Sequence, residues 1–510
     1  MDIFADVTAE HAGSPALTAD GVTYSYECLS LWSQAISRRL RSSGVRRGDR
    51  VALRLPAGAE AIAAILGILR MGAAYVPLEV RNPSARNRFI LEDSRAAAFI
   101  GDPDGCPVGG MPVLGAAEVT SLKDARQPPT DEETPDPGDT AYVIYTSGTT
   151  GQPKGVPIHH GAVHALLAGA ARRFSFSAAD SWLLFHSIAF DFSVWEIWGP
   201  LSTGGRLVVL PVGTARSAQE SLRFLEEHGV TILNQTPTAF AELSAAALDA
   251  GVDLPLLRYV IFDGEKLTPG AVRPWAKRFG LQRPILVNMY GITETTVHTT
   301  FHEVTSADLA SDESVIGLPL PGFTFRIVDP ETRENAGPGE RGELWLAGPQ
   351  LSQGYVNRPE LNAEHFVETP APDGGATIRY YRTGDIVSLA PGGDLIFHGR
   401  ADLQVKLRGH RIELGDIESA LESHEQIAHA VVWVREFGPG DERLVCAYVP
   451  VTAETVIDAR VLRRHAGNQL PTYMCPVGYQ PIGRLPRTTN GKTDRAEAAR
   501  LWEEERKRSR

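Results

Sequence analysis

Short runs of β-branched and other apolar residues recur along the first 300 residues, and segments with helical spacing lie between them. The runs occupy residues 207–210, 230–233, 259–262 and 285–288. Upstream, residues 59–71 have the composition of an Ala/Ile/Leu helix ending at Gly72, and residues 73–78 predict a buried strand that Pro77 terminates. Because strands and helices alternate, the pattern predicts α/β architecture with a parallel sheet covered on both faces.

After Gly399 the pattern changes to that of a smaller α+β unit. It predicts helices near residues 413–422 and 458–469, and strands near residues 430–435 and 444–449. We therefore predict a large N-terminal αβ domain with several sheets, residues 1–401, and a small, mobile α+β domain, residues 402–510. The acidic, proline-rich segment 128–138 is expected to be a surface connection, and the hydrophilic tail 503–510 is expected to be solvated.

Composition and charge narrow the class of protein. The chain has 510 residues, with 62 acidic against 50 basic residues and a net charge of −12, which argues against nucleic acid as a partner. Its four cysteines are scattered without a Cys-x-x-Cys spacing, which argues against a disulfide framework and a zinc site. No basic leader and no apolar run of about 20 residues is present, so we expect a cytoplasmic protein with no membrane partner.

The segment 145–155, which we call the glycine-rich loop, carries the first sign of chemistry. It follows the apolar run 141–144 and contains three glycines, three threonines, one serine and one lysine. Such a loop can approach a polyphosphate closely and surround it with N–H, hydroxyl and ammonium donors, although its spacing is not that of a P-loop. It predicts a clamp for ATP, with a flexible linker as the alternative, and the residues of this clamp are Thr146, Ser147, Gly148, Thr149, Thr150, Gly151 and Lys154.

Further motifs follow in a fixed order along nearly the whole chain. They are LRMGAAYVPL at 69–78, FDFS at 190–193, NMYGITETT at 288–296, GELW at 342–345, YRTGD at 381–385, GRAD at 399–402, QVKLRG at 404–409, LPTYM at 470–474 and NGK at 490–492. Together with the glycine-rich loop, these motifs resemble the acyl-adenylate-forming, AMP-binding superfamily, and specifically the amino-acid adenylation domains of nonribosomal peptide synthetases. The resemblance implies the luciferase-like fold and the activation of a carboxylate by ATP, with transfer to a phosphopantetheine thiol.

The resemblance also assigns the charged residues that this chemistry requires. A carboxylate oxygen that attacks the α-phosphate of ATP brings two anions together, so cations must converge on the reacting atoms. The resemblance implies that Lys492 bridges the substrate carboxylate and the nucleotide, and that Glu294 binds Mg²⁺, which prefers oxygen ligands. Without the family context, Lys492 would be an exposed turn residue and Glu294 an exposed residue at a helix start.

Other motif positions are implied to hold the nucleotide. Asp385 corresponds to an aspartate that accepts both ribose hydroxyls, and Arg400 adds a second nucleotide contact. A surface ion pair is the alternative for either residue. The remaining implied contacts are Gly264, Glu265, Tyr290, Gly291 and Thr293.

A hinge is implied between the two predicted domains. The resemblance places it at Asp402, where the small domain would swing between an adenylating pose and a thioester-forming pose. Gly399 and Gly409 nearby are consistent with such a motion, because a few residues must absorb the dihedral change. After the swing, the segment 408–410 would face the site and admit the phosphopantetheine thiol.

The substrate pocket is implied residue by residue. Asp191 corresponds to the aspartate that pairs with the α-ammonium group of an amino acid, and its alternative is a helix N-cap. The other pocket positions are Phe192, Trp195, Asn234, Ile261, Asp263, Met289, Val297 and His298. This set resembles the threonine-selecting pattern, and Asn234 and His298 offer polar atoms to a small hydroxylated side chain. L-Threonine or a β-hydroxy relative is therefore the expected substrate.

Asp263 departs from that pattern, because threonine activators usually carry glycine at this position. A buried carboxylate needs a partner, and we expect protonated His298, a water molecule or a cation on the substrate. The last of these would favour 2,3-diaminobutyrate, and a further alternative is that Asp263 points away from the pocket.

Several alternatives remain for the protein as a whole. The same chemistry could act on 2-aminobutyrate. Alternatively, the chain is an acyl-CoA or aryl-acid ligase, or a catalytically silent nucleotide-binding module; aminoacyl-tRNA synthesis is the most distant alternative. No condensation motif and no carrier segment is found, so the chain is expected to be free-standing or excised from a larger synthetase and to load a separate carrier protein. A small MbtH-like protein is a candidate partner.

Overall fold

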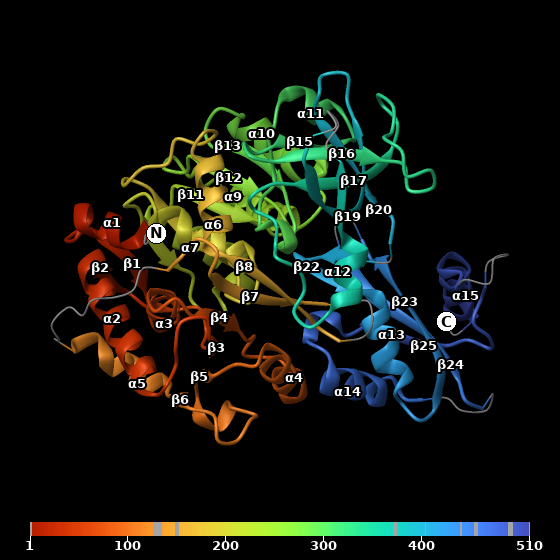
Figure 1. Cartoon of the computed structure of the whole chain (residues 1–510). Coiled ribbons are helices and arrows are strands. Elements are labelled where there is room, and N and C mark those ends of the chain that lie inside the picture. The colour runs from red at the N-terminus through yellow and green to blue at the C-terminus, as the bar shows by residue number, and fades with distance from the viewer. Residues whose placement is uncertain are drawn as a thin grey trace. The chain divides into compact units, whose positions relative to one another are not determined.

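The computed structural model describes residues 3–125, 135–147, 152–370, 375–402, 404–438, 441–452, 457–487 and 493–508 (Figure 1). The chain divides into two compact units. The first comprises Met1–Val80, Leu91–Tyr145 and Gly155–Ala401, and the second comprises Arg81–Ile90, Thr146–Lys154 and Asp402–Arg510. Each unit is described by itself.

One sheet in the N-terminal part has six strands. Their order is β6 (Val113–Leu114), β5 (Ala98–Gly101), β3 (Arg50–Arg54), β4 (Ala74–Pro77), β7 (Thr140–Thr146) and β8 (Lys154–His159). The pairs from β6 to β7 are parallel. Helix α3 (Ala59–Arg70) lies next to β3 and β4 in the chain, and nearly all of its residues are buried, as its Ala/Ile/Leu composition predicts.

The other sheet has a parallel half and an antiparallel half. The parallel strands, in order, are β1 (Pro15–Ala19), β10 (Arg206–Val209), β9 (Ser181–Leu184), β11 (Ile232–Gln235), β12 (Tyr259–Phe262) and β13 (Ile285–Tyr290). The antiparallel strands are β2 (Val22–Ser25), β14 (Thr300–Glu303), β15 (Ser314–Pro319), β20 (Leu395–Arg400), β19 (Thr377–Leu389), β17 (Gly342–Ala347), β16 (Thr324–Val328) and β18 (Phe366–Pro370).

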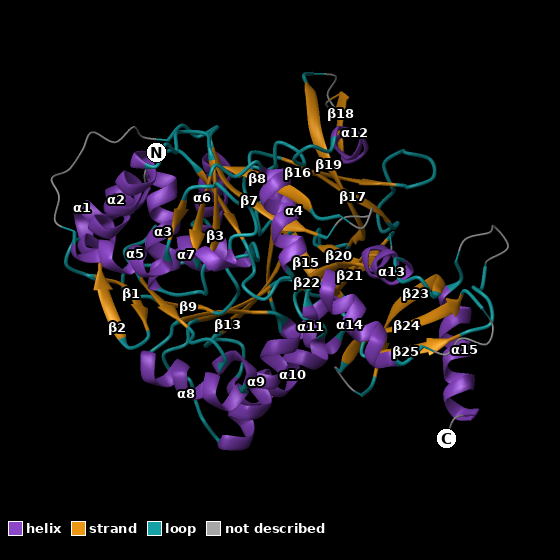
Figure 2. Ribbon diagram, turned by 90° about the horizontal axis from the view of Figure 1, so that it is seen from below, coloured by secondary structure: helices purple, strands orange, loops and turns teal. Residues whose placement is uncertain are grey.

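Both faces of the parallel strands are buried, as the continuous apolar runs predict. In β12, Ile261 belongs to one apolar cluster, whereas Val260 and Phe262 belong to another. Because successive side chains of a strand point to opposite faces, these two clusters lie on the two sides of the sheet. Figure 2 shows α7 (Phe192–Leu201) on one side and α8 (Ala218–His228), α9 (Pro237–Ala250) and α10 (Pro269–Phe279) on the other.

The remaining helices of the N-terminal part are α1 (Ile3–His11), α2 (Tyr26–Ser42), α4 (Ser84–Ser94), α5 (Ala116–Ser121), α6 (His160–Ala170), α11 (Ser306–Ala310) and α12 (Pro359–His365). No helix within the described ranges is both long and apolar enough to cross a membrane.

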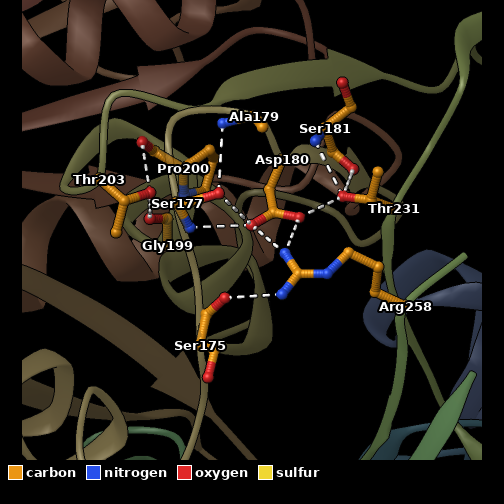
Figure 3. A network of polar contacts seen from close by, with 10 residues as sticks. All are labelled: Ser175, Ser177, Ala179, Asp180, Ser181, Gly199, Pro200, Thr203, Thr231 and Arg258. Atoms are coloured by element: carbon orange, nitrogen blue, oxygen red, sulfur yellow. Dashed lines mark hydrogen bonds and ion pairs between the residues drawn. The ribbon is translucent and has the colours of Figure 1, made fainter. Parts of the chain in front are cut away.

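A partly buried ion pair joins the amino ends of the parallel strands (Figure 3). Asp180 precedes β9 and is 1% exposed, and its two oxygens lie 2.5 and 2.6 Å from Nη1 of Arg258, which precedes β12. Its carboxylate also accepts hydrogen bonds from the hydroxyl of Thr231 at 2.7 Å and from the backbone N–H of Ser177 at 2.8 Å. Arg258 donates further to the carbonyl of Ser175. This network links β9 and β12 at their amino ends, which form the edge of the sheet opposite to the carboxyl ends of the strands.

The second unit has the predicted α+β composition. It contains the hairpin of β21 (Gln404–Leu407) and β22 (His410–Glu413), then α13 (Leu414–Glu422), β23 (Ile427–Glu436), β24 (Glu442–Pro450), α14 (Ala459–Gln469), β25 (Gly478–Pro481) and α15 (Arg495–Arg508). The expected solvated tail begins within α15, which continues to Arg508, and the side chains of Glu503 and Glu504 in it are 43% and 44% exposed. Trp502 of this helix is buried against Trp433 of β23, with ring centroids 5.6 Å apart.

Candidate active site

The predicted substrate residues lie at the carboxyl ends of neighbouring parallel strands. Asn234 of β11 is in register with Ile261 of β12, and Ile261 is in register with Val287 of β13. Met289 lies near the end of β13, and Asp263 directly follows β12. Because the carboxyl ends of parallel strands meet at one edge of a sheet, these residues converge there although they are distant in sequence.

Asp191 lies at the start of α7 and is 6% exposed. Asp191 occupies the N-cap position of α7, as the alternative expected, but its side chain makes no capping hydrogen bond to the described residues of that helix. Instead, its Oδ2 accepts a hydrogen bond of 2.6 Å from the hydroxyl of Thr293. Thr293, predicted to hold the nucleotide, therefore contacts a residue that was predicted to bind the substrate.

Trp195 orients Asn234. The spacing of Phe192 and Trp195 places their side chains on one face of α7. The indole N–H of Trp195 donates to Oδ1 of Asn234 at 2.9 Å, and Asn234 is fully buried. Its Nδ2 has no hydrogen-bond partner within the described part of the chain. Asn234 therefore keeps one donor for a ligand.

Asp263 and His298 form a buried pair. Oδ2 of Asp263 lies 2.7 Å from Nδ1 of His298, and Oδ1 accepts from the backbone N–H of Gly264 at 2.5 Å. Asp263 thus does not point away from the pocket. The ring of His298 contacts Phe192 and Trp195 edge-on, with centroids 5.1 and 5.0 Å apart. Its Nε2 is buried and lacks a hydrogen-bond partner among the described residues.

A strained turn carries His298. Thr296 and Val297 both have positive φ, 59° and 64°, which is rare for any β-branched residue. The buried amide of Gln350 donates to the carbonyls of Thr295, Thr296 and His298 at 3.2, 3.4 and 2.9 Å. The hydrogen bonds from Gln350, a residue outside the turn, therefore stabilise its conformation.

The turn packs directly against the backbone of Gly291. A Cβ atom at Gly291 would lie 1.6 Å from the carbonyl oxygen of Val297, so no other residue fits there without moving the backbone. Glycine at this motif position thus has a packing reason.

Two predicted nucleotide residues, Tyr290 and Arg400, contact a third, Asp385, which is fully buried. The hydroxyl of Tyr290 lies 2.5 Å from Oδ2, and Nη1 of Arg400 lies 2.8 Å from Oδ1. Burial, followed by the charge of Asp385, raises the pKa of Tyr290 well above its usual range, so the phenol stays protonated and donates. The pair of Asp385 and Arg400 is buried, so the alternative of a surface ion pair is wrong.

Glu294 is fully buried rather than exposed. Its Oε1 accepts a hydrogen bond of 2.7 Å from Tyr355, whose hydroxyl lies 2.9 Å from that of Tyr381. Within the described ranges, no group of three or more His, Cys, Asp or Glu side chains is arranged to hold a metal. A single carboxylate fits a Mg²⁺ ion that takes its other ligands from phosphates.

Glu265 has a contact that the sequence did not indicate. Its Oε2 accepts from the backbone N–H of Thr238 at 3.1 Å, in the first turn of α9. A carboxylate at a helix N-terminus is stabilised by the unpaired N–H groups and the helix dipole. Gly264 before it has φ +83°, which explains glycine at this position.

The glycine-rich loop is described only at its ends. Its residues Gly148, Thr149, Thr150 and Gly151, and Lys492, lie outside the described residues. Ser147 donates to the carbonyl of Arg411 in β22 at 2.8 Å and accepts from the backbone N–H of Glu413, within the second unit. Lys154 is 1% exposed. The hydroxyl of Thr146 is buried without a partner in the described part of the chain, as suits a loop built to bind a ligand.

Asp402, the predicted hinge, accepts a hydrogen bond from the backbone N–H of Gln404 at 3.1 Å. Arg408 and Gly409, at the turn of the β21–β22 hairpin, have positive φ values of 50° and 79°. These values fit a tight hairpin turn.

The sequence interpretation missed several residues that touch the predicted ones. They are Gln350, Tyr355 and the pair of His186 with Glu196, whose Nδ1 and Oε1 atoms lie 2.9 Å apart. The ring of His186 stacks on Phe192, with centroids 4.4 Å apart. The sequence signal available for Glu196 was a single charged residue in the otherwise apolar helical segment that begins at Phe192, since Glu in such a segment is rarely buried without a partner.

The chain is similar to known proteins over most of its length. The family described as AMP-binding enzyme matches residues 4–356, and its C-terminal domain family matches residues 416–492. The chain is 42% identical to syringomycin synthase SyrB1 of Pseudomonas syringae pv. syringae, over 97% of this chain and 80% of that protein. It is 43% identical to a dimodular nonribosomal peptide synthase of Bacillus subtilis, over 94% of this chain but 21% of that protein.

A solved structure also matches. It is NpsA-ThdA, an artificially fused adenylation-PCP di-domain from Klebsiella oxytoca, with a TM-score of 0.84 and 26% identity over 94% of this chain and 93% of that one. The fold and its site thus define an adenylate-forming ligase. The chain belongs to the AMP-binding enzyme family, and within it resembles adenylation domains of nonribosomal peptide synthetases. The predicted family, fold and ligase class are confirmed.

Proposed function

We propose that this chain activates a small polar L-amino acid as its aminoacyl-AMP and then transfers it to the phosphopantetheine thiol of a separate carrier protein. The observation that carries this proposal is the buried carboxylate of Asp191, oriented by Thr293 beside the pocket residues Phe192 and Trp195. A buried carboxylate favours a cationic ligand, and the α-ammonium group of an amino acid is such a ligand. Aryl and fatty acids lack this group.

In this proposal the nucleotide is bound by the cluster around Asp385. The carboxylate of Asp385 has lone pairs left beyond its bonds to Tyr290 and Arg400 and would accept the ribose hydroxyls. Glu294 would hold Mg²⁺, which offsets the charge of the phosphates when it is bound. Lys492 would reach the reacting carboxylate, and the glycine-rich loop would hold the leaving pyrophosphate.

L-Threonine is the proposed substrate. The buried Nδ2 of Asn234 and the buried Nε2 of His298 are polar atoms without partners among the described residues, and both side chains contact Trp195. Unpaired buried polar groups are costly, so the pocket favours a ligand that bonds to them. A hydroxyl group on Cβ meets this requirement, whereas valine and 2-aminobutyrate do not.

A carrier protein is the proposed acceptor. The solved structure NpsA-ThdA is, by its title, an adenylation domain fused to a PCP domain, and that supports the proposal. Domain rotation about Asp402, at the end of residues 1–401, would bring the small domain, residues 402–510, into a thioester-forming pose. An MbtH-like protein would be an auxiliary partner, tested by whether adding one raises activity.

ATP–pyrophosphate exchange tests the proposed function. The panel is threonine, serine, valine, 2-aminobutyrate and 2,3-diaminobutyrate, and threonine should give the highest kcat/KM. Asp191→Asn should lower that value by about 100-fold, because it removes a charged partner of the ammonium group. Asp253→Asn, which alters an exposed ion pair with Arg278, is the matched control and should leave exchange unchanged.

The acyl-CoA or aryl-acid ligase is the competing function. Thioester formation on coenzyme A with an acid that lacks an amino group, and with Asp191→Asn as active as the parent, would refute amino-acid activation. If the protein binds ATP tightly but catalyses pyrophosphate exchange with none of the acids tested, it is a silent nucleotide-binding module.

A further inference from the structure

We infer that Asp263 is a positioning residue: it fixes His298 so that Nε2 of this histidine accepts the hydroxyl proton of the substrate, and it does not bind the substrate itself. This inference rests on the proposed function, because it concerns how the same pocket distinguishes a hydroxyl group from a methyl or an ammonium group. Nothing in the threonine-selecting pattern assigns such a role to this position, where glycine is usual.

Both oxygens of Asp263 are used inside the protein. Oδ1 accepts from the backbone N–H of Gly264 at 2.5 Å, and Oδ2 lies 2.7 Å from Nδ1 of His298. An ionised carboxylate only accepts hydrogen bonds, so the proton of the second contact is on Nδ1. In the neutral ring, the lone pair is then on Nε2.

The ring of His298 cannot turn without loss of contacts. It is fully buried and packs edge-on against Phe192 and Trp195, at interplanar angles of 89° and 84°. Its backbone carbonyl accepts from the amide of Gln350 at 2.9 Å. A flip of the ring would break the bond to Asp263, so the direction of Nε2 is fixed.

Asn234 supplies the complementary atom. Its Oδ1 is used by the indole of Trp195, which leaves the Nδ2 donor. A hydroxyl group needs a donor to its oxygen and an acceptor for its proton, and Asn234 and His298 offer one of each. A methyl group satisfies neither atom. An ammonium group only donates, so it would meet the Nδ2 donor of Asn234, which argues against 2,3-diaminobutyrate.

The substitution Asp263→Asn tests this role because it reverses the tautomer. The backbone N–H of Gly264 needs an acceptor, so the amide oxygen stays there and the amide NH₂ faces Nδ1 of His298. Nδ1 must then accept, and the ring proton moves to Nε2. Two donors would face the substrate hydroxyl, and its proton would lose its acceptor.

The readout is kcat/KM in pyrophosphate exchange for threonine and for 2-aminobutyrate, measured side by side. Asp263→Asn should lower the threonine value by about 10- to 100-fold and leave the 2-aminobutyrate value within about threefold, because only threonine uses Nε2. For Asp263→Gly, kcat/KM for threonine should lie between the values of the parent and Asp263→Asn, since a water molecule can accept from Nδ1 without fixing the ring. A merely structural role would lower both substrates together.

Asp308→Asn is the matched control. It alters another Asp–His pair, in which Oδ2 of Asp308 lies 3.0 Å from Nε2 of His302, and it should leave both kcat/KM values unchanged. A second measurement is ¹⁵N NMR of histidine-labelled protein, with the resonances of His298 identified by their loss in His298→Gln. The parent should show a protonated Nδ1, and Asp263→Asn a protonated Nε2.

The outcomes separate the two proposals. A parent that prefers threonine while Asp263→Asn keeps the same ratio of threonine to 2-aminobutyrate would overturn the positioning role alone. A parent that prefers 2,3-diaminobutyrate, with that preference lost in Asp263→Asn, would show that Asp263 binds the substrate directly. A parent that uses valine or 2-aminobutyrate as well as threonine would overturn both the threonine assignment and the positioning role, and a parent that uses no amino acid would overturn the proposed function.

Discussion

The substitution Gln350→Leu should loosen the turn that carries His298. The amide of Gln350 is 1% exposed, and its Nε2 donates to the carbonyls of Thr295, Thr296 and His298. Leucine fills a similar volume but cannot donate. The change therefore leaves buried carbonyl groups unpaired, which costs about 1–3 kcal/mol.

The strain in the turn sets the scale of the effect. Val297 has φ 64°, and a residue held in such a sparsely populated region stores about 1–3 kcal/mol. The free energy contributed by the hydrogen bonds of Gln350 is thus similar to the strain energy of the turn, so the turn can relax when these bonds are lost. A shift of 1–3 kcal/mol changes the population of the binding-competent turn by about 5- to 150-fold.

Steady-state pyrophosphate exchange measures this shift. In Gln350→Leu, kcat/KM for the amino acid should fall by about 10- to 100-fold, while KM for ATP should change less than about threefold. Gln353→Leu, at an exposed position three residues away, is the control and should behave as the parent. If Gln350→Leu keeps kcat/KM for the amino acid within threefold, or if KM for ATP rises equally, the turn is not held by these bonds.

Two further predictions concern the rest of the molecule. Asp180→Asn should destabilise the protein by about 1–3 kcal/mol in urea unfolding, because the buried carboxylate loses its charge-assisted hydrogen bonds while solvent partly screens Arg258, which is 32% exposed. KM for the amino acid should stay unchanged, since the pair lies at the opposite edge of the sheet; a changed KM with unchanged stability would contradict this. Burial raises the pKa of the Cys446 thiol, so it should stay unreactive to a thiol reagent at pH 8 until the chain unfolds, whereas rapid labelling of native protein at this residue would show that β24 opens easily.

The fold was largely predictable because its signals are local. The run 259–262 coincides with β12, and residues 59–71 with α3, since continuous apolar runs and Ala/Leu-rich segments specify buried strands and helices directly. The C-terminal helix α15 was not predicted. Most of its residues are charged, which gives no apolar periodicity. Its place depends on the contact of Trp502 with Trp433, which lies 69 positions earlier in the numbering (502 − 433).

The candidate site was predictable as a set of residues, because the resemblance to the family implies Asp191, Asn234, Asp263 and His298. Of their partners, only His298 was among those expected, as one of three candidates for Asp263. Thr293 was predicted to hold the nucleotide, yet it donates to Asp191 across 102 positions of the chain. Such contacts depend on the order in which strands assemble in the sheet, and no local pattern encodes that order.

The sequence by itself determined the family, the ligase chemistry and the presence of one unusual carboxylate, because each of these depends on which residue types occur and in what order. Only the tertiary structure decided what that carboxylate does. It brings the loop after β12 and the strained turn after β13 together, so that Asp263 meets His298 across 35 positions rather than solvent or a ligand. The reason is physical: a buried charge takes its role from the group that the fold places within hydrogen-bond distance.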